Sequence, residues 1–268
     1  MKKEYEPVKF RRLCAVLLAT LLTAACAQAA DFGQELFDFF VRKMDPEKAE
    51  LHLQSLPTEK GEIPWAYLEC VNANVRGMNI QSLKMDCFDA VITPPEQWKK
   101  VEHPYVLSMM ACHAEGIFTE KDVNTFLHNR LFGHDKEWER ISVRMKDDRI
   151  NAVGWYNANL KLMRVKVKLE LSCRIAGRGT ALWLEDVILK VNDKKMSKVM
   201  VEKAIDKIQP FLDMKKYNLP LYLTKIELSD GVCRVASRIP PRPLAGGIRY
   251  EHERSPQEVS DEFAPVKR

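Results

Sequence analysis

The spacing of hydrophobic residues changes between a helical and a strand period along the chain. Residues 32–44 carry apolar side chains every three or four positions, which predicts an amphipathic helix rich in phenylalanine. From about residue 49 the period falls to two, and Pro and Gly residues separate short runs at 49–56, 66–76, 79–91 and 106–115. This pattern predicts a series of short strands after the first helix.

A capping box predicts the next helix. Thr119 stands before the apolar run as the N-cap residue, and Asp122 follows three residues later as its acidic partner. Apolar residues continue on one face as far as Leu131, and Gly133 marks the end of the pattern. We therefore expect a helix at about 120–132.

The clearest alternation lies at residues 163–175, where odd positions are apolar and even positions are mainly basic. It predicts a strand with one apolar and one basic face. Residues 141–145 and 150–155 predict a hairpin beside this strand. The next run, 181–191, is apolar on both faces, as expected where something covers each side of the sheet.

The last third of the chain begins with a helical period over residues 193–212. Two strands at 219–228 and 232–237 then predict a hairpin. Beyond residue 239 the chain is Pro-rich and charged without any period, which predicts a disordered tail. The order of elements predicts an α+β fold in which a sheet wraps around helices.

The N-terminus has the three parts of an export signal. Basic residues at 2–12 precede an apolar run at 13–25, and Ala27-Gln28-Ala29 forms a small-x-small cleavage site. The apolar run is shorter than the roughly 20 residues that span a bilayer, so cleavage after Ala29 is favoured over a permanent anchor. A second reading attaches lipid to Cys26, which follows small residues. Both readings place the folded part in the periplasm or cell envelope.

Composition and charge exclude several classes of protein. Of the 268 residues, 46% are hydrophobic and 29% are charged, which are ordinary values for a globular chain. The formal net charge is +5, but residues 1–29 carry five Lys or Arg against two Glu, so the remainder has only +2. Net charge therefore gives no support to nucleic-acid binding.

The chain lacks the common motifs of catalysis and metal binding. No G-x-S-x-G, P-loop, glycine-rich dinucleotide turn or H-E-x-x-H motif occurs, so we expect no catalytic residue, metal or cofactor. Five cysteines follow the signal, at 70, 87, 112, 173 and 233, and none is part of a C-x-x-C pair. Either one or two disulfides form, with Cys70 and Cys87 best placed across a turn near Gly77, or all five are small buried residues.

The apolar faces exceed the needs of one obvious core, and this surplus favours a slot for acyl chains. The candidate lining residues come from the predicted helices and the strand at 181–191: Phe37, Phe40, Leu182, Leu184, Ile188, Met196, Met200, Ile208 and Phe211. The candidate residues for an anionic head group are Arg164, Lys166, Lys168 and Arg174. The same basic row is also explained as the solvated outer face of an antiparallel sheet, and the phenylalanine-rich helix as ordinary core packing.

The order of these features resembles the LmeA-like phospholipid-binding family of exported bacterial proteins. The resemblance covers about residues 47–238, and its most specific part is the helix start Thr119-Glu120-Lys121-Asp122-Val123-Asn124. The other carriers are the strands around 67–75 and 80–90 with the turn Gly77-Met78-Asn79-Ile80, residues 114–118, the strand series 141–191, the helix 193–212, residues 219–223 and the Asp230-Gly231 hairpin.

The resemblance implies phospholipid binding in the cell envelope and, by likeness to tubular lipid-binding proteins, a strongly curved antiparallel sheet wrapped around long amphipathic helices. It supplies no catalytic residues. The chain then divides into a signal peptide at 1–29, an N-terminal helix at 30–46, the lipid-binding domain at 47–238 and the tail at 239–268. We expect a non-catalytic protein that binds, and in one reading transfers, phospholipid at a membrane surface.

Two other classes remain open on the sequence. In the first, the surplus apolar faces form an interface of a structural envelope module, with a second copy or another envelope protein as partner. In the second, the protein is an envelope hydrolase, which needs a carboxylate or His with a shifted pKa in a cleft. The sequence reveals no such group.

Overall fold

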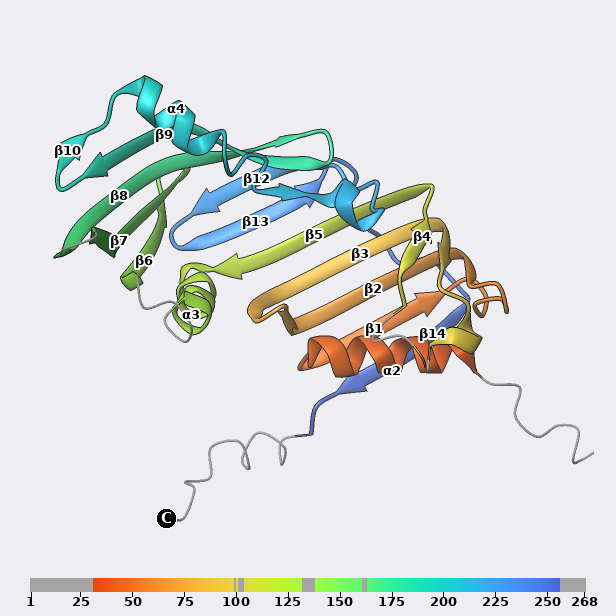
Figure 1. Ribbon diagram of the computed structural model, residues 1–268. Helices are drawn as coiled ribbons and strands as arrows, with labels where there is room; N and C mark the ends of the chain where they lie inside the picture. The colour runs from red at the N-terminus through yellow and green to blue at the C-terminus, as the bar shows by residue number, and fades with distance from the viewer. Residues whose placement is uncertain (1–30, 99, 101–103, 132–137, 161–162, 256–268) are drawn as a thin grey trace, which may run out of the picture. The chain divides into compact units, whose positions relative to one another are not determined.

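Two antiparallel sheets and three α-helices make up the computed structural model, which describes residues 31–98, 100, 104–131, 138–160 and 163–255 (Figure 1). In the first, sheet A, the strands run in the order β12-β13-β5-β3-β2-β1-β14, and β4 pairs with β3. Its strands are β1 (Lys48–Leu53), β2 (Glu62–Val75), β3 (Met78–Ile92), β4 (Val106–Ser108), β5 (Ala111–Thr119), β12 (Leu223–Ser229), β13 (Val232–Ser237) and β14 (Ile248–Glu253).

The second sheet, sheet B, has the order β10-β9-β8-β7-β6, and β11 pairs with β9. Its strands are β6 (Trp138–Lys146), β7 (Arg149–Leu160), β8 (Met163–Arg178), β9 (Ala181–Val191), β10 (Lys194–Lys195) and β11 (Leu212–Asp213). The helices are α2 (Phe32–Met44), α3 (Glu120–Leu131) and α4 (Lys198–Ile205), with 3-10 turns η1 (Pro95–Gln97) and η2 (Met214–Tyr217). The predicted α+β fold dominated by antiparallel strands is therefore confirmed at this level.

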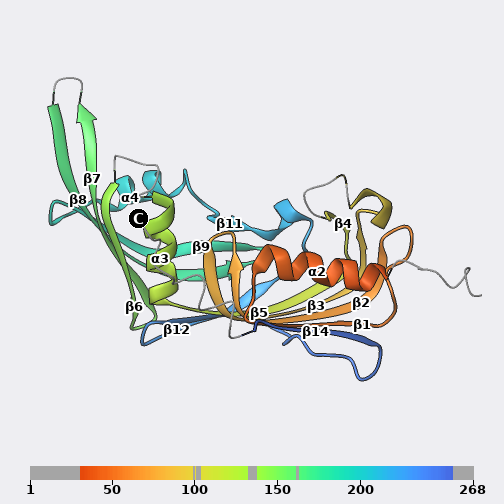
Figure 2. The same cartoon turned by 90° about the horizontal axis from the view of Figure 1, so that it is seen from below.

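Alternation along the strands gives sheet A an inner face that must be covered. Leu51 and Leu53 of β1 are 1% and 0% exposed, and on β2 Leu68 and Cys70 point to the same side. Helix α2 lies along this face over β1, β2 and β3 (Figure 2). The apolar residues of α2 predicted from the sequence supply its buried contacts, and the bounds 32–44 are confirmed.

A second core covers the inner face of the other half of sheet A. Val143 and Met145 of β6 and Leu182 of β9 pack with Cys233 and Val235 of β13. Helix α3 contributes partly buried apolar side chains to the same core. Sheet B is thus joined to sheet A through buried side chains rather than through strand pairing.

The capping box of α3 forms as the sequence predicts. One carboxylate oxygen of Asp122 accepts hydrogen bonds from the backbone N–H of Thr119 (2.8 Å) and from its hydroxyl (2.6 Å), while the Asp122 N–H donates back to the Thr119 hydroxyl at 3.2 Å. Asn79 of β3 adds a hydrogen bond to the other oxygen at 3.0 Å. The cap therefore also ties the helix start to sheet A.

The predicted helix over 193–212 is wrong in length. Only Lys198–Ile205 is helical, and residues on either side form β10 and β11 on the edge of β9. Asn192 and Asp193 both have positive φ, 48° and 65°, so the chain reverses in a hairpin turn before the helix begins. The helix then starts at the N-cap Ser197, whose hydroxyl accepts from the Met200 N–H.

The prediction that residues 239–268 are a disordered tail is wrong for 248–253. These residues form β14, which pairs with β1 along six positions. The connection from β13 passes over the outer face of sheet A, where the Arg242 N–H donates to an Asp86 carboxylate oxygen at 3.1 Å. On this face Trp65, Tyr67 and Asp86 are no more than 4% exposed. Residues 256–268 lie outside the described residues.

No disulfide joins the five described cysteines in this structure, and the register rules out the pair favoured by the sequence. Cys70 stands opposite Leu83, and Cys87 stands opposite Ala66. The two cysteines are therefore four residues apart along the ladder, or about 13 Å at strand spacing, which is beyond the roughly 7 Å limit of a disulfide.

The signal peptide, the cleavage site after Ala29 and lipid attachment at Cys26 lie outside the described residues. Within the described ranges, no helix has the length and hydropathy needed to cross a bilayer.

Substitution of Gly177 tests the close approach of sheet B to sheet A at this residue. A side chain at Gly177 of β8 would overlap the carbonyl oxygen of Leu223 on β12, whereas Gly116 of β5 has open space beside it. We expect Gly177→Ala to lower the free energy of unfolding by about 1–3 kcal/mol, because backbone atoms must shift. Gly116→Ala should leave it unchanged or raise it slightly. Urea unfolding of both variants checks this, and equal stabilities would contradict the close approach.

The α3 cap predicts a dependence of stability on pH. Burial alone would raise the pKa of Asp122, but hydrogen bonds from Thr119 and Asn79 outweigh it and lower this pKa below its usual range. The stabilisation is therefore present at neutral pH and is lost as pH falls through the lowered pKa. We expect Asp122→Asn to cost about 1 kcal/mol at pH 7 and progressively less in acid.

Thermal unfolding from pH 7 to pH 2 measures the difference between wild type and Asp122→Asn. Glu59→Gln, at an exposed position between β1 and β2, is the control and should unfold like wild type throughout. A difference that stays constant down to pH 2 would show that the Asp122 charge does not stabilise the cap.

Candidate functional site

A cavity of about 230 Å³ lies between α2 and the inner face of sheet A. We call it the α2 cavity. It exists because the strand residues under the helix include Ala66 and Ala90, whose side chains do not reach the aromatic rings of α2. Its lining residues are Leu36, Phe39, Phe40, Leu51, Ile63, Ala66, Leu68, Met85, Asp86, Cys87, Ala90, Ile92, Pro104, Val106, Met109 and Leu219.

The one charged residue of this lining turns its carboxylate away from the cavity. Asp86 stands between Met85 and Cys87, which face inward, so alternation directs its side chain to the outer face. There its oxygens bond to Nδ1 of His113 at 2.8 Å and to the backbone N–H of Arg242 at 3.1 Å. None of the described lining residues therefore places a charge inside the α2 cavity.

Exposed apolar side chains border one side of the cavity. Pro104, Val106, Met109 and Leu219 line the cavity on this side. The neighbouring side chains that point outward are Tyr105, Leu107, Met110 and Tyr222, exposed to 50%, 55%, 67% and 54%. We call these four residues the rim.

Two segments carry the rim, and they lie side by side. The Asn218 side-chain amide donates to the Val106 carbonyl at 2.9 Å, and Leu221 forms a β-bridge with Cys112. An exposed group of Leu, Met and Tyr side chains next to an apolar cavity is typical of a surface that contacts membrane or another apolar partner.

Cations without an acidic partner lie beside the same segments. Lys215 and Lys216 of η2 are exposed, and neither forms an ion pair with a carboxylate in the part of the chain that the structure describes. Arg76 donates to the hydroxyl of Tyr217 at 3.2 Å and stacks over its ring at 5.1 Å. Positive charge next to the rim therefore stays available to an anionic group.

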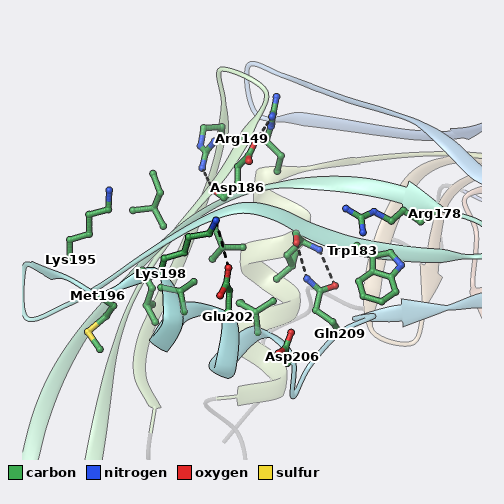
Figure 3. A pocket seen from close by; sticks show the side chains of 17 residues that line it. Arg149, Arg178, Trp183, Asp186, Lys195, Met196, Lys198, Glu202, Asp206 and Gln209 are labelled. Atoms are coloured by element: carbon green, nitrogen blue, oxygen red, sulfur yellow. Dashed lines mark hydrogen bonds and ion pairs between the residues drawn. The ribbon is translucent and has the colours of Figure 1, made fainter.

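A second hollow, an open groove of about 990 Å³, lies between β9 and α4 (Figure 3). Its walls mix apolar side chains with both signs of charge. Arg174 pairs with Asp186, Arg178 pairs with Glu185, and Lys198 pairs with Glu202 at 3.8 Å.

A side chain hydrogen-bonds to part of the β9 backbone that faces this groove. The amide of Gln209 accepts from the Leu184 N–H at 3.3 Å and donates to the Leu184 carbonyl at 2.8 Å, as a neighbouring strand would (Figure 3). An acyl chain in the groove would lie against these polar pairs, so the α2 cavity is the better apolar site.

The structure divides the predicted lipid-lining residues among five environments. Phe40 lines the α2 cavity, whereas Phe37 is buried and stacks on Tyr250 with ring centroids 5.9 Å apart. Leu182 is part of the second core. Leu184, Ile188 and Met196 line the open groove. Met200, Ile208 and Phe211 are largely exposed and line neither hollow.

Three predicted head-group residues are already neutralised. Lys166 pairs with Glu139 at 2.5 Å, and Arg174 pairs with Asp186. Lys168 pairs with Glu170 at 2.6 Å and with Asp193 at 2.8 Å, and these hydrogen bonds raise the pKa of the lysine. None of the three lines the α2 cavity. The side chain of Arg164 lies outside the described residues.

The cysteine thiols near the α2 cavity have raised pKa values, whereas the charged side chains of the open groove include three ion-paired cations. No group of three metal-ligating side chains occurs among the described residues. Burial raises the pKa of Cys87 to about 11 and that of Cys70 to about 12. Burial and the hydrogen bond to Glu69 also raise the pKa of Tyr67. These groups are therefore protonated and weakly reactive near neutral pH.

The main cavity residues missed by sequence reasoning lie on β2 and β3. Met85 lies between Lys84 and Asp86, so the period-two pattern signalled an apolar face at this point, whereas Ala66 lies between Trp65 and Tyr67 and gives no such signal. What the pattern lacked was the partner of that face, because packing of α2 on these strands is not encoded locally.

Comparison with known proteins yields no relative, since no protein-family model, no curated protein and no solved structure matches the chain. The geometry of the described residues is therefore the basis for a functional proposal.

Proposed function

We propose that the protein is an exported, non-catalytic phospholipid-binding protein that holds an acyl chain in the α2 cavity. The observation that carries this proposal is a cavity whose described lining places no charge inside it, bordered by an exposed apolar rim and by cations that pair with no carboxylate among the described residues. The resemblance to the LmeA-like family, the export signal and placement in the cell envelope are parts of the same proposal.

The volume of the cavity sets how much of a lipid enters it. At about 30 Å³ for each water-sized group, 230 Å³ takes roughly eight methylene-sized groups. Burying these out of water gains about 6 kcal/mol at 0.8 kcal/mol for each CH₂. An empty apolar cavity of this volume costs on the order of 5 kcal/mol of stability. A single chain end therefore fits, and the rest of the lipid passes out at the rim.

Binding of one acyl chain does not require the tubular architecture that the resemblance implies. A strongly curved sheet wrapped around long amphipathic helices would enclose whole lipids. Binding of one chain requires only that a helix of 13 residues covers one sheet face, as α2 does. We propose that Lys215, Lys216 and Arg76 contact the anionic head group, in place of the paired residues on β8.

Lipid analysis tests the proposal directly. We expect native mass spectrometry of the mature protein, purified in contact with membranes, to show one bound phospholipid that organic extraction releases and identifies. A protein mass without ligand, even after incubation with vesicles, would contradict lipid binding.

Filling the cavity with a side chain separates binding from folding. We expect Ala66→Phe to abolish the bound lipid while keeping or raising the melting temperature, because the new ring occupies the space of the acyl chain. Ala176→Phe, on β8 outside both hollows, is the matched control and should retain lipid. Full lipid retention in Ala66→Phe would show that the chain binds elsewhere.

The rim predicts attachment to membranes. We expect Leu107→Asp combined with Met110→Asp to weaken vesicle binding by at least tenfold in a flotation assay, because charged side chains do not enter the acyl region. Leu244→Asp, an exposed leucine on the connection that crosses the outer face, is the control. Equal loss in both variants would show that the effect is not specific to the rim.

A structural envelope module is the alternative, and exposed apolar residues near α4 favour it. Val199, Met200, Ile208 and Phe211 are exposed to between 42% and 61%. If these residues form an interface, light scattering will show a mass that rises with concentration while the protein carries no extractable lipid.

A further inference from the structure

Sheet A places two cysteines directly opposite one another on neighbouring strands. Cys87 of β3 is the register partner of Cys112 of β5. Residues directly opposite in an antiparallel pair project to the same face, so both thiols lie on the inner face of the sheet. The three other described cysteines stand opposite Leu83, Ile150 and Phe118.

Backbone hydrogen bonds show which kind of pair this is. The Glu120 N–H donates to the Gly231 carbonyl at 2.7 Å, which continues the ladder between β5 and β13 by one position. Even-numbered residues at the end of β5 therefore turn their backbone groups toward β13, and odd-numbered residues turn theirs toward β3. Cys112 and Cys87 thus form a non-hydrogen-bonded pair.

The dimensions of such a pair suit a disulfide. In a non-hydrogen-bonded antiparallel pair the Cα atoms are about 4.5 Å apart and the side chains approach more closely than in a hydrogen-bonded pair. Disulfides span Cα separations of roughly 4.4 to 6.8 Å. The general spacing of such a pair therefore falls within the range of a disulfide.

We propose that Cys87 and Cys112 form a cross-strand disulfide in the exported protein. The proposal rests on export, because an oxidising compartment is where such bonds persist. The two thiols lose two protons and two electrons as their S–S bond forms. The oxidant is a disulfide of a small thiol or of an oxidoreductase, whose own S–S bond breaks and takes up both protons and electrons as two thiols.

The surroundings of the two sulfurs indicate when the bond forms. Cys87 is half-buried and lines the α2 cavity, whereas Cys112 is 2% exposed. Burial raises the pKa of Cys112 to about 12, so the folded protein presents little thiolate to an oxidant. Oxidation therefore precedes the packing of the two cores over these thiols, and the finished bond is shielded from reductants.

The bond would join the two cores described above. Cys87 packs against the core under α2, and Cys112 is part of the core shared with sheet B. The link also forms part of the cavity wall, where a sulfur of the disulfide replaces the Cys87 thiol. Its effect on stability is separate from any effect on lipid.

Peptide mass spectrometry tests the proposal on the full chain. The protein is exported in cells, denatured without reductant in the presence of an alkylating agent, and digested. We expect a cross-linked peptide that contains Cys87 and Cys112, with alkyl groups on the cysteines at 70, 173 and 233. Alkylation of all five, or a link between any other two cysteines, would overturn the proposal.

Two variants and a melting measurement complete the test. Cys87→Ser should leave Cys112 alkylated, while Cys233→Ser, at a buried position on β13, should keep the link. In wild type and Cys233→Ser, reduction should lower the melting temperature by on the order of 5 to 10 °C, a shift that Cys87→Ser lacks. If Cys87→Ser does not fold, the reduction shift in wild type and the cross-linked peptide decide alone, and absence of both refutes the bond.

The readout is independent of the proposed function. Alkylation is measured after denaturation, so bound lipid does not affect the count of blocked thiols. A protein that carries lipid but no link would refute the disulfide alone, and a linked protein without lipid would refute only lipid binding.

Discussion

The need to cover the inner face of sheet A is the constraint on which the other features of this protein depend. Leu51, Leu53 and Leu68 project from this face, and a row of such residues is not stable in water. A helix covers one half of the face, and β6, β9 and α3 cover the other half. Because a helix touches a broad sheet only along a stripe, small residues under its border leave the space that forms the α2 cavity.

The two hollows differ in their electrostatics, and this difference supports the α2 cavity over the open groove as the proposed lipid site. In the open groove three cations pair with carboxylates, and an apolar ligand would have to lie against these and the other charged side chains or displace their water. In the α2 cavity the alternation of β3 directs Asp86 to the opposite face, where His113 and the backbone of Arg242 hold it. The crossing segment thus helps keep the cavity free of charge by holding this carboxylate on the outer face.

Local signals predicted those parts of the fold that local interactions determine. The apolar spacing of 32–44 and the capping box at Thr119 gave helices whose bounds agree with the structure within one or two residues. The prediction of a helix over 193–212 is wrong in length because Asn192 and Asp193 form a turn, and Ser197 caps the helix only after that turn. Strand β14 was missed because its partner β1 lies about 200 positions earlier in the sequence.

The site was harder to predict than the elements, since it depends on which face meets which. Of the nine lining residues predicted from the sequence, only Phe40 borders the α2 cavity. Most of the other residues that line this cavity lie on β2 and β3. The cysteines show the same limit. Cys70 and Cys87 are neighbours across a turn in sequence, yet the register places Cys112, not Cys70, opposite Cys87. Spacing along the chain predicts that strands pair, but only the register determines which side chains meet.

If the α2 cavity holds an acyl chain as we propose, its energetics suit exchange of lipid better than permanent storage. An acyl chain gains about 6 kcal/mol for eight methylenes when it leaves water, but almost nothing when it leaves a bilayer, whose interior is equally apolar. Transfer between the cavity and a membrane is therefore nearly balanced, and small contributions at the rim decide its direction. Exposed Leu107 and Met110 favour contact with the membrane, and Lys215 and Lys216 favour an anionic surface. A lipid site of the kind we propose would retain its ligand in water and release it at a bilayer.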